Sequence, residues 1–392
     1  MNTTESPDIC LADANSKEIL RCIRQNGPLS RSEICEKTNI SKPTMTRATN
    51  LLLQEGYLQE IESVKTARGR RPITLDLCQT AAYSFGINIS KKYLSIALVD
   101  FKLNVVDKEK TRIQDLGGVS QFLDQIADTV LRMQKENGIP DKKILGIGVG
   151  APGLIDNVNG IIRDFAQWGK LRNIHIAEFL QEKTGFWTKV ENNCNTWLMG
   201  EMWNGYAQGC SNALFILNGE GVGCGIAHHA EIHNIPGGLG HISVDLRGDR
   251  CYCGSRGCIE TYCSTDSIER KAEEKYASLC KTVGEGKYTL PIDYGTVCQS
   301  VSEGDFFFAD ILLEASTAIA CGIVTLIKIF SPEIIILSGN LFEASDFYYN
   351  SVVMEIQSQL SFGIAMPRVV RRNVSDALFE IGAATLILQT LF

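Results

Sequence analysis

The residues of this chain that are best suited to bind a metal gather in one short stretch. One imidazole and three thiols lie within eighteen residues of one another, at His241, Cys251, Cys253 and Cys258. Thiolate and imidazole ligands favour tetrahedral Zn²⁺, and a site closed by three cysteines and one histidine is structural rather than catalytic. Gly254 and Gly257 supply the backbone freedom that such a tight loop needs. Incidental packed thiols are the alternative, but four such ligands rarely coincide so closely. We expect one structural zinc ion per chain.

The composition is that of a water-soluble globular protein. The chain has 392 residues, of which 44% are hydrophobic and 21% charged, and its length predicts two or three domains. No signal peptide opens the sequence, and the longest apolar stretch, 319–329, is interrupted by Gly322 and Lys328. The 14 cysteines indicate metal-bound or packed thiols in a reducing compartment. We therefore expect a cytoplasmic protein without membrane insertion.

Charge is distributed unevenly along the chain. Residues 16–75 contain eleven Lys or Arg against six Asp or Glu, a net charge of +5, whereas the remainder carries −12. A small basic segment joined to a large acidic body favours contact with DNA at one end of the molecule. Residues 1–15 are polar and acidic without periodicity, and we expect them to form a flexible tail.

Residues 16–76 have the pattern of a winged helix-turn-helix. Three short helical segments follow one another, and the second opens with Ser30 and Glu33 at the spacing of a capping box. The third begins at Ser41, tolerates Pro43 in its first turn, and buries a face made of Met45, Ala48 and Leu52. Its other faces carry side chains suited to phosphates and base edges, as in a recognition helix. These are Lys42, Thr44, Thr46, Arg47 and Asn50.

A polar hairpin over residues 63–71 follows, and its tip is basic. Arg68, Arg70 and Arg71 surround Gly69 just before Pro72. Arginines on a flexible arm suit the narrow, negative minor groove of DNA. The alternative is a helical dimerisation module with a solvated basic loop. Because the helices, the wing and the charge agree, we favour DNA binding.

From residue 77 onward the pattern is that of an α/β body. Apolar hairpins are predicted at 84–100 and again at 213–227, each followed by helical stretches. This duplication predicts two lobes around a cleft, with the polar helical region 268–304 elaborating the second lobe. The whole body spans residues 77–392. We expect lobe 1 over about 77–195 plus the C-terminal helix, and lobe 2 over about 196–375.

These features together resemble the ROK family, which comprises bacterial sugar kinases and sugar-responsive transcriptional repressors. The resemblance covers nearly the whole chain. It rests on Gly69-Arg70-Arg71-Pro72, on Ala151–Asp156, on Val190–Asn193 and on the loop from Gly240 to Glu260. It implies an actin-like, hexokinase-like two-lobed body behind the winged helix-turn-helix. It also implies that His241, Cys251, Cys253 and Cys258 are the zinc ligands.

At three places this chain lacks residues that the kinases of that family use for phosphoryl transfer. Kinases of the family carry Asp-x-Gly-Gly-Thr where this chain has Asn88-Ile89-Ser90-Lys91-Lys92, so an acidic residue that helps position Mg²⁺ and both phosphate-cradling glycines are missing. Glu220 stands in the second phosphate turn, where a carboxylate repels a triphosphate. The catalytic Asp of the kinases corresponds to Asn193, which cannot accept a proton at neutral pH. We predict that the chain is not an enzyme.

Much of a sugar-binding surface survives, as the same resemblance implies. Its residues are Pro152, Gly153, Asn192, Asn193, His241 and Glu260. The alternative is that these polar groups only satisfy buried backbone. One position departs from the family, which reads Gly-Glu-Ile/Leu-Gly-His: here Gly238 replaces the Glu that grips the sugar near its reducing end. A buried hydroxyl without its acceptor costs about 1–3 kcal/mol, which points to weak binding, no response to sugar, or a modified, phosphorylated or larger ligand.

The sequence therefore predicts a DNA-binding transcriptional regulator, a repressor of carbohydrate-utilisation genes. Its binding to double-stranded operator DNA would respond to a sugar in the cleft. A homodimer or a dimer of dimers would place two reading heads on half-sites related by two-fold symmetry. One alternative is an ATP-dependent sugar kinase with a fused DNA-binding head. Another is a redox sensor in which thiol oxidation ejects zinc and releases DNA.

Overall fold

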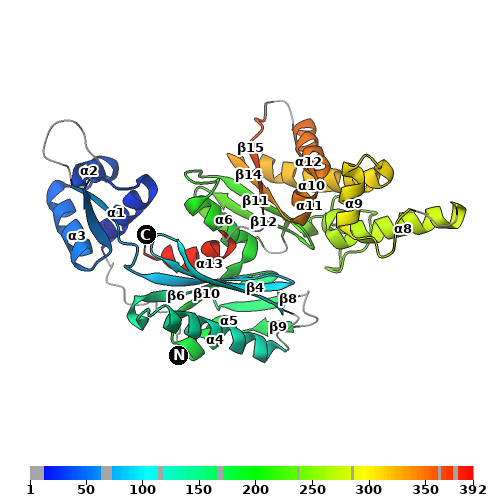
Figure 1. The fold of residues 1–392 in the computed structure, drawn as a ribbon. Helices are drawn as coiled ribbons and strands as arrows, with labels where there is room; N and C mark the ends of the chain where they lie inside the picture. Colours follow the sequence, from blue (N-terminus) through cyan, green and yellow to red (C-terminus); the bar gives the residue numbers. More distant parts are fainter. Residues whose placement is uncertain are drawn as a thin grey trace. The chain divides into compact units, whose positions relative to one another are not determined.

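The chain folds into two compact units (Figure 1). One is built from residues 1–196 and 377–392, and the other from residues 197–376. The computed structural model describes residues 13–62, 73–113, 118–165, 171–235, 238–283, 287–360, 363–373 and 378–391.

The N-terminal part of the first unit is a winged helix-turn-helix (Figure 1). The predicted capping box is confirmed at the start of the second helix, where the Ser30 backbone N–H donates to Glu33 Oε2 (2.7 Å) and the Glu33 N–H donates to Ser30 Oγ (3.3 Å). Ser41 is the N-cap of the third helix without a capping hydrogen bond from its side chain. The elements are α1 (Ala14–Asn26), α2 (Arg31–Thr38), α3 (Lys42–Gln54) and the antiparallel pair β1 (Leu58–Glu62) and β2 (Ile73–Leu77).

A small apolar core holds this module together. The predicted buried face of α3 is confirmed, because Met45, Ala48 and Leu52 are all nearly inaccessible to solvent. Arg31 at the start of α2 connects this helix to α3 and β1, since its guanidinium donates to Thr49 Oγ1 (3.2 Å) and to Glu60 Oε1 (3.2 Å). Other fully buried apolar side chains of the module are Ile19, Leu20, Ile23, Ile34 and Leu75.

The rest of the first unit is a five-stranded sheet in the order β10-β6-β3-β4-β5. The first three strands along the chain form an antiparallel meander, and the other two join it in parallel. The strands are β3 (Tyr83–Ile89), β4 (Tyr93–Asp100), β5 (Val105–Arg112), β6 (Ile144–Ala151) and β10 (Thr188–Asn192). A smaller antiparallel sheet contains β7 (Leu154–Asp156), β8 (Ile161–Phe165) and β9 (Leu171–Ile174).

Helices cover both faces of the five-stranded sheet (Figure 1). On one face lie α4 (Val119–Glu136) and α5 (Ile176–Thr184), whose apolar side chains pack into the core with those of the strands. On the other lies α13 (Leu378–Leu388). This helix approaches so closely that a Cβ on Gly86 or Gly148 would lie 1.8 Å from one of its backbone carbonyl oxygens. Only glycine fits at these two positions.

The second unit repeats the same strand order. Its sheet runs β13-β12-β11-β14-β15, again with an antiparallel meander and two parallel strands added beside the first strand of that meander. The strands are β11 (Ala213–Asn218), β12 (Val222–His228), β13 (Glu231–His233), β14 (Ile334–Ser338) and β15 (Arg368–Arg372). This repetition confirms the predicted duplicated α/β body.

Helices make up most of the remainder of the second unit. They are α7 (Glu260–Cys263), α8 (Thr265–Val283), α9 (Tyr294–Ser302), α10 (Ala309–Phe330), α11 (Asn340–Ala344) and α12 (Asp346–Gln359), while α6 (Asn193–Asn204) begins in the first unit and ends in the second. The segment Phe306–Phe330 is long and apolar enough to cross a membrane by length and composition. However, 67% of its most apolar window is buried inside the fold, as in the core helix of a globular domain.

Candidate functional site

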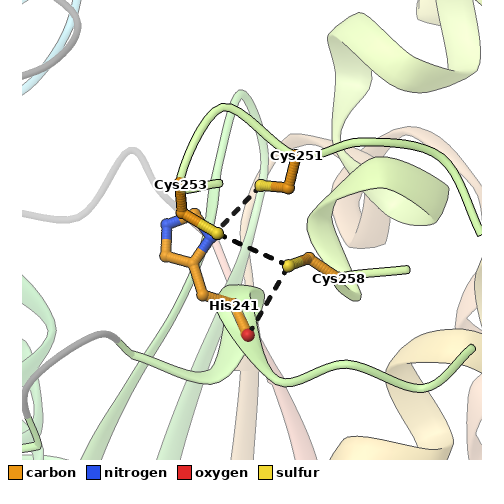
Figure 2. A group of neighbouring side chains, drawn as sticks. All are labelled: His241, Cys251, Cys253 and Cys258. Atoms are coloured by element: carbon orange, nitrogen blue, oxygen red, sulfur yellow. Dashed lines mark hydrogen bonds between the residues drawn. The ribbon is translucent and has the colours of Figure 1, made fainter. Parts of the chain in front are cut away.

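The predicted metal ligands come together in the second unit, on the loop that precedes α7 (Figure 2). His241 ends a short 3₁₀ turn, Leu239–His241, and the three cysteines follow on a loop that folds back over it. Backbone hydrogen bonds close this loop, from Val244 N to Gly257 O (2.8 Å) and from Ile259 N to Ile242 O (3.0 Å). The four donor atoms therefore meet because the backbone of the loop is fixed on both sides.

Glycine is required where the loop turns. Gly254 and Gly257 both have positive φ angles, 97° and 61°. A Cβ on Gly257 would also lie 1.7 Å from the backbone oxygen of Asp245. The backbone freedom that the sequence predicted for these two positions is thus confirmed, and Gly257 is needed for space as well.

The distances between the donor atoms suit a tetrahedral ion. Cys251 Sγ lies 3.5 Å from His241 Nδ1, Cys253 Sγ lies 3.6 Å from Cys258 Sγ, and all four donors lie within 4.8 Å of one another. With Zn–S bonds of about 2.3 Å and Zn–N bonds of about 2.0 Å, a tetrahedral ion separates two sulfurs by about 3.8 Å and a sulfur from a nitrogen by about 3.5 Å. The residues present could hold a metal ion, and the donor set is compatible with zinc.

The thiols of this cluster lie in different surroundings. Cys251 and Cys258 are buried, whereas Cys253 is exposed. Burial raises the pKa of the Cys258 thiol to about 12, and a backbone hydrogen bond from Ser255 lowers the pKa of Cys253. A bound divalent cation deprotonates its thiol ligands outright. A buried thiol with a raised pKa therefore becomes a thiolate only when a cation pairs with it.

Tyr252 supports the histidine of the cluster, and the sequence analysis missed it. Its hydroxyl lies 3.1 Å from His241 Nε2, on the side of the ring away from the sulfurs, and the two rings meet edge to face at 5.1 Å. Such a partner fixes the orientation of an imidazole ligand. The signal that could have found it is its position between Cys251 and Cys253.

Glu260 begins α7 two residues after the last cysteine. Its Oε2 accepts a hydrogen bond from the backbone N–H of Val222 (3.0 Å), at the first residue of β12. A Cβ on Gly240 would lie 3.0 Å from the same oxygen. The carboxylate is therefore held against the turn between β11 and β12, in the same unit as the metal cluster.

A cavity of about 210 Å³ adjoins His241 in the second unit. Gly238, where the family carboxylate is missing, is one of its lining residues and has open space in the direction of a Cβ, although its φ of 62° disfavours any side chain. Most of the lining is apolar. The residues are Cys224, Ile235, Gly238, Leu239, His241, Ile242 and Leu326.

Four of the predicted sugar-binding residues form a separate group in the first unit. Pro152 and Gly153 lie between β6 and β7, and Asn192 Nδ2 donates to the backbone oxygen of Gly153 (3.3 Å). The side-chain oxygens of Asn192 and Asn193 both accept from the N–H of Cys194 (2.9 Å each), which is the start of α6. These two amides therefore also satisfy a backbone N–H group, which is the role that the alternative interpretation assigns to them.

Glu191, beside these amides, was missed in the sequence analysis. The residue as a whole is only 6% exposed. It accepts from Asn157 Nδ2 (2.9 Å), Asn195 Nδ2 (3.2 Å) and the N–H of Asn192 (2.7 Å). Three donors satisfy the charge, so Glu191 positions its asparagine neighbours.

The residues that replace the kinase phosphate loop shape the turn between β3 and β4. Asn88 is 8% exposed within β3. The Ser90 hydroxyl donates to the backbone oxygen of Tyr93 (2.9 Å) and accepts from its N–H (3.0 Å). Lys91 follows in the turn itself. The Ser90 side chain thus closes a hairpin at the place where the sequence resemblance predicts the glycine pair of the kinases.

The predicted DNA-contacting residues of α3 lie on the outside of the module. Lys42, Thr46 and Arg47 are exposed, while Thr44 is half-buried with its Oγ1 2.9 Å from Ser41 Oγ. The β1–β2 pair ends at Glu62 and Ile73. The predicted wing residues Arg68, Arg70 and Arg71 fall between these and lie outside the described residues.

The family of this chain follows from its sequence as well as from its fold. A model described as the ROK family matches residues 84–390, and one described as winged helix-turn-helix DNA-binding matches residues 13–59. The chain therefore belongs to the ROK family.

Individual relatives agree with this assignment. The chain is 27% identical over 354 residues to the xylose repressor of Bacillus spizizenii, covering 88% of this chain and 87% of the relative. A crystal structure described as a ROK family transcriptional regulator, a homologue of the Escherichia coli Mlc protein, has the same fold, with a TM-score of 0.81, 24% identity and 96% of each chain covered. The ROK hexokinase of Thermus thermophilus matches with a TM-score of 0.67 and 23% identity over 79% of this chain and 99% of its own.

Proposed function

We propose that this chain is a sequence-specific transcriptional regulator, a repressor of carbohydrate-utilisation genes. The observation that carries the proposal is the outer surface of α3, where Arg47 is exposed on the opposite side from the buried Met45 and Leu52 and Lys42 is exposed on a flank. An exposed, basic second helix of this motif enters the major groove of DNA. The related xylose repressor supports the same class of function.

Two sets of residues would contact operator DNA. Lys42, Thr44, Thr46 and Arg47 would do so from α3, and Arg68, Arg70 and Arg71 would enter the minor groove from the wing. The net charge of +5 over residues 16–75 supports this arrangement, because phosphate contacts supply most of the affinity of such modules.

We assign one structural Zn²⁺ per chain to His241, Cys251, Cys253 and Cys258. When bound, the ion supplies a crosslink and no reaction chemistry, since no open coordination position remains. The chain's own residues then do the positioning. Cys258 lies two residues before Glu260, so the crosslinked loop fixes the start of α7 and with it the carboxylate that bonds Val222 N.

A sugar or sugar derivative is the proposed effector. The ligands that we propose are Pro152, Gly153, Asn192 and Asn193, which lie close together in the first unit. His241 and Glu260 are further ligands predicted from the sequence. The unfilled space beside Gly238 favours a modified sugar over an ordinary hexose, because the missing carboxylate leaves a mostly apolar cavity.

The effector would act by differential affinity for two conformations of the protein. A coupling of about 1–3 kcal/mol between ligand and DNA is typical of such switches. We propose a cytoplasmic homodimer or dimer of dimers, because two reading heads match two half-sites related by two-fold symmetry.

Selection of genomic DNA fragments by the purified full chain tests this function. We expect a few fragments to be enriched, to contain inverted half-sites, and to bind at least about 10³-fold more tightly than unrelated DNA. Arg47→Glu should abolish the enrichment, whereas Arg21→Glu, at an arginine on α1 paired with Glu18, is the matched control and should retain it. A wild-type chain that enriches no sequence would refute the proposal.

A further inference from the structure

The exposed residues of α3 divide into a central stripe and two flanks. At about 100° per residue, Pro43, Thr46, Arg47, Asn50 and Gln54 fall within an arc of about 100° that faces away from the buried side. All five are exposed. Lys42 and Thr44 project about 100° to either side of Pro43. Only the central stripe points directly away from the core of the module, and it is the part that can reach the floor of a groove.

Two hydroxyls of this helix are already used. The Thr46 hydroxyl donates to the backbone oxygen of Lys42 (2.9 Å), so this side chain presents its methyl group outward. The Thr44 hydroxyl is occupied with Ser41 Oγ at 2.9 Å. The single proton of the Thr46 hydroxyl is therefore committed to the helix backbone, and this hydroxyl cannot donate to a base edge without losing its present bond.

The side chains of Arg47 and Asn50 differ from those of Arg31 and Arg21, the two bonded arginines of the module. Arg31 is bonded to Thr49 and Glu60, and Arg21 is paired with Glu18. In the part of the chain that the structure describes, no hydrogen bond or ion pair engages the side chains of Arg47 or Asn50. Gln54 in the same stripe also has no bonded partner among the described residues, but it is the last residue of α3. Because the N-terminal part of a recognition helix contacts base edges, Arg47 and Asn50 are the better candidates for reading bases.

We propose that Arg47 reads a guanine and Asn50 an adenine at neighbouring base pairs, while the methyl group of Thr46 packs against a thymine methyl. Arg suits the O6 and N7 of guanine, and Asn suits the N6 and N7 of adenine. The two residues are three apart, about 4.5 Å along the helix axis, which is close to the 3.4 Å rise of one base pair. Lys42 and Thr44, on the flanks, contact phosphates and carry no sequence information. This inference rests on the proposed DNA-binding function.

The test uses the full chain and a library of random duplexes to define a consensus half-site. Binding of every single-base-pair variant of that half-site is then measured for each protein variant. Arg47→Ala should weaken binding to the consensus by about 5- to 150-fold and remove the preference at one G·C pair. Asn50→Ala should do the same at the adjacent A·T pair. Lys42→Ala should instead weaken all sequences equally and reduce the salt dependence of log Kd by about one.

Thr46 offers a matched pair of substitutions. Thr46→Val keeps the outward methyl group and removes the hydroxyl, so the preference for thymine should remain. Thr46→Ser keeps the hydroxyl and removes the methyl, so that preference should disappear. Circular dichroism of each variant establishes that the helices are intact.

Two results would overturn the inference. One is an Arg47→Ala or Asn50→Ala chain that keeps every base preference of the wild type or loses affinity equally for all sequences. The other is a Thr46→Val chain that loses the thymine preference while Thr46→Ser retains it. Selection of no consensus by the wild-type chain is a different failure, because it refutes the proposed function itself.

Discussion

At the scale of single residues, the metal site in the loop before α7 depends on the positions and protonation of its four donor side chains. The four donors lie within 4.8 Å of one another, which is compatible with a tetrahedral ion, and the thiols of Cys251 and Cys258 have raised pKa values because both are buried. Such a group of donors is stable only when a cation compensates the buried thiolates. The loop has few apolar contacts that could replace this crosslink, since Leu246 and Tyr252 on it are exposed.

We therefore expect Cys258→Ser to lose the bound metal. Zinc measured by elemental analysis of the purified chain should fall from about one per chain to near zero, and the thermal unfolding midpoint should fall with it. Cys263→Ser is the matched control, because Cys263 is equally buried and only five residues away but bonds the backbone oxygen of Ile259. A wild-type chain with no stoichiometric zinc, or equal metal in both variants, would contradict the assignment.

Residue identity also argues against phosphoryl transfer. We expect no ADP release above background from ATP with common hexoses in a coupled assay, and none from an Asn193→Asp variant. The restored carboxylate alone is insufficient, because Ser90 closes the β3–β4 turn and Glu220 repels the phosphates. Turnover by the wild type that Asn193→Ala abolishes would show that the chain is a kinase.

The sequence predicted the metal ligands because their spacing is itself the signal. The position of Tyr252 between two of these ligands indicates that it lies near the site, but its contact with His241 Nε2 depends on how the loop folds. The spacing of Glu191 carries no comparable signal, because its role depends on the asparagine side chains that the fold brings to its carboxylate. Gly257 was predicted from its type, but its contact with Asp245 required the structure.

At the scale of elements, the helices of the DNA-binding module depend on different caps. Ser30 satisfies a backbone donor at the start of α2, and its hydrogen bonds lower the pKa of Glu33. We expect Ser30→Ala to destabilise α2 by about 1 kcal/mol, and amide hydrogen exchange over residues 31–38 to become about five times faster. Ser41→Ala is the control, because Ser41 makes no capping hydrogen bond with its side chain and α3 should exchange at an unchanged rate. If Ser41→Ala accelerated exchange in α3 as much as Ser30→Ala accelerates it in α2, the loss of the capping box would not explain the faster exchange.

The same cap predicts a pH dependence with a definite sign. A carboxyl group whose pKa is lowered by folding stabilises the folded state above its unfolded pKa of about 4.3. That contribution is lost as pH falls through the lower folded pKa of Glu33. The difference in exchange between the wild type and Ser30→Ala should therefore narrow below about pH 4. A difference that grows on acidification would contradict this explanation.

Elements with clear apolar patterns were predicted, and those without one were not. The hairpins β3–β4 and β11–β12 and the helix α4 follow from alternating or helical apolar spacing. The strand β5 escaped notice because it is an edge strand whose side chains alternate between exposed and half-buried and are mostly charged. Its position comes from pairing with β4, which is tertiary information.

At the scale of the whole molecule, the chain contains two five-stranded sheets with the same strand order and one N-terminal helix-turn-helix module. The repeated order of the two five-stranded sheets explains why the chain shares its fold with a ROK hexokinase, while the N-terminal module explains its similarity to a ROK regulator. The body therefore has the fold of a ROK hexokinase, whereas the sequence resemblance predicts that Asn88 and Asn193 occupy two of the positions that phosphoryl transfer requires. We propose an effector-binding role for such a body.

Operator occupancy, measured against a panel of sugars, addresses both halves of the proposed function at once. Fluorescence anisotropy of a labelled, genome-selected operator with the full chain gives the apparent Kd with and without each sugar. We predict a sequence-specific complex whose Kd changes by about 5- to 150-fold with at least one sugar or sugar derivative. A chain that forms no sequence-specific DNA complex under any condition would contradict the account. A specific complex indifferent to every sugar, phosphosugar and substituted sugar would remove the effector role while leaving DNA binding in place.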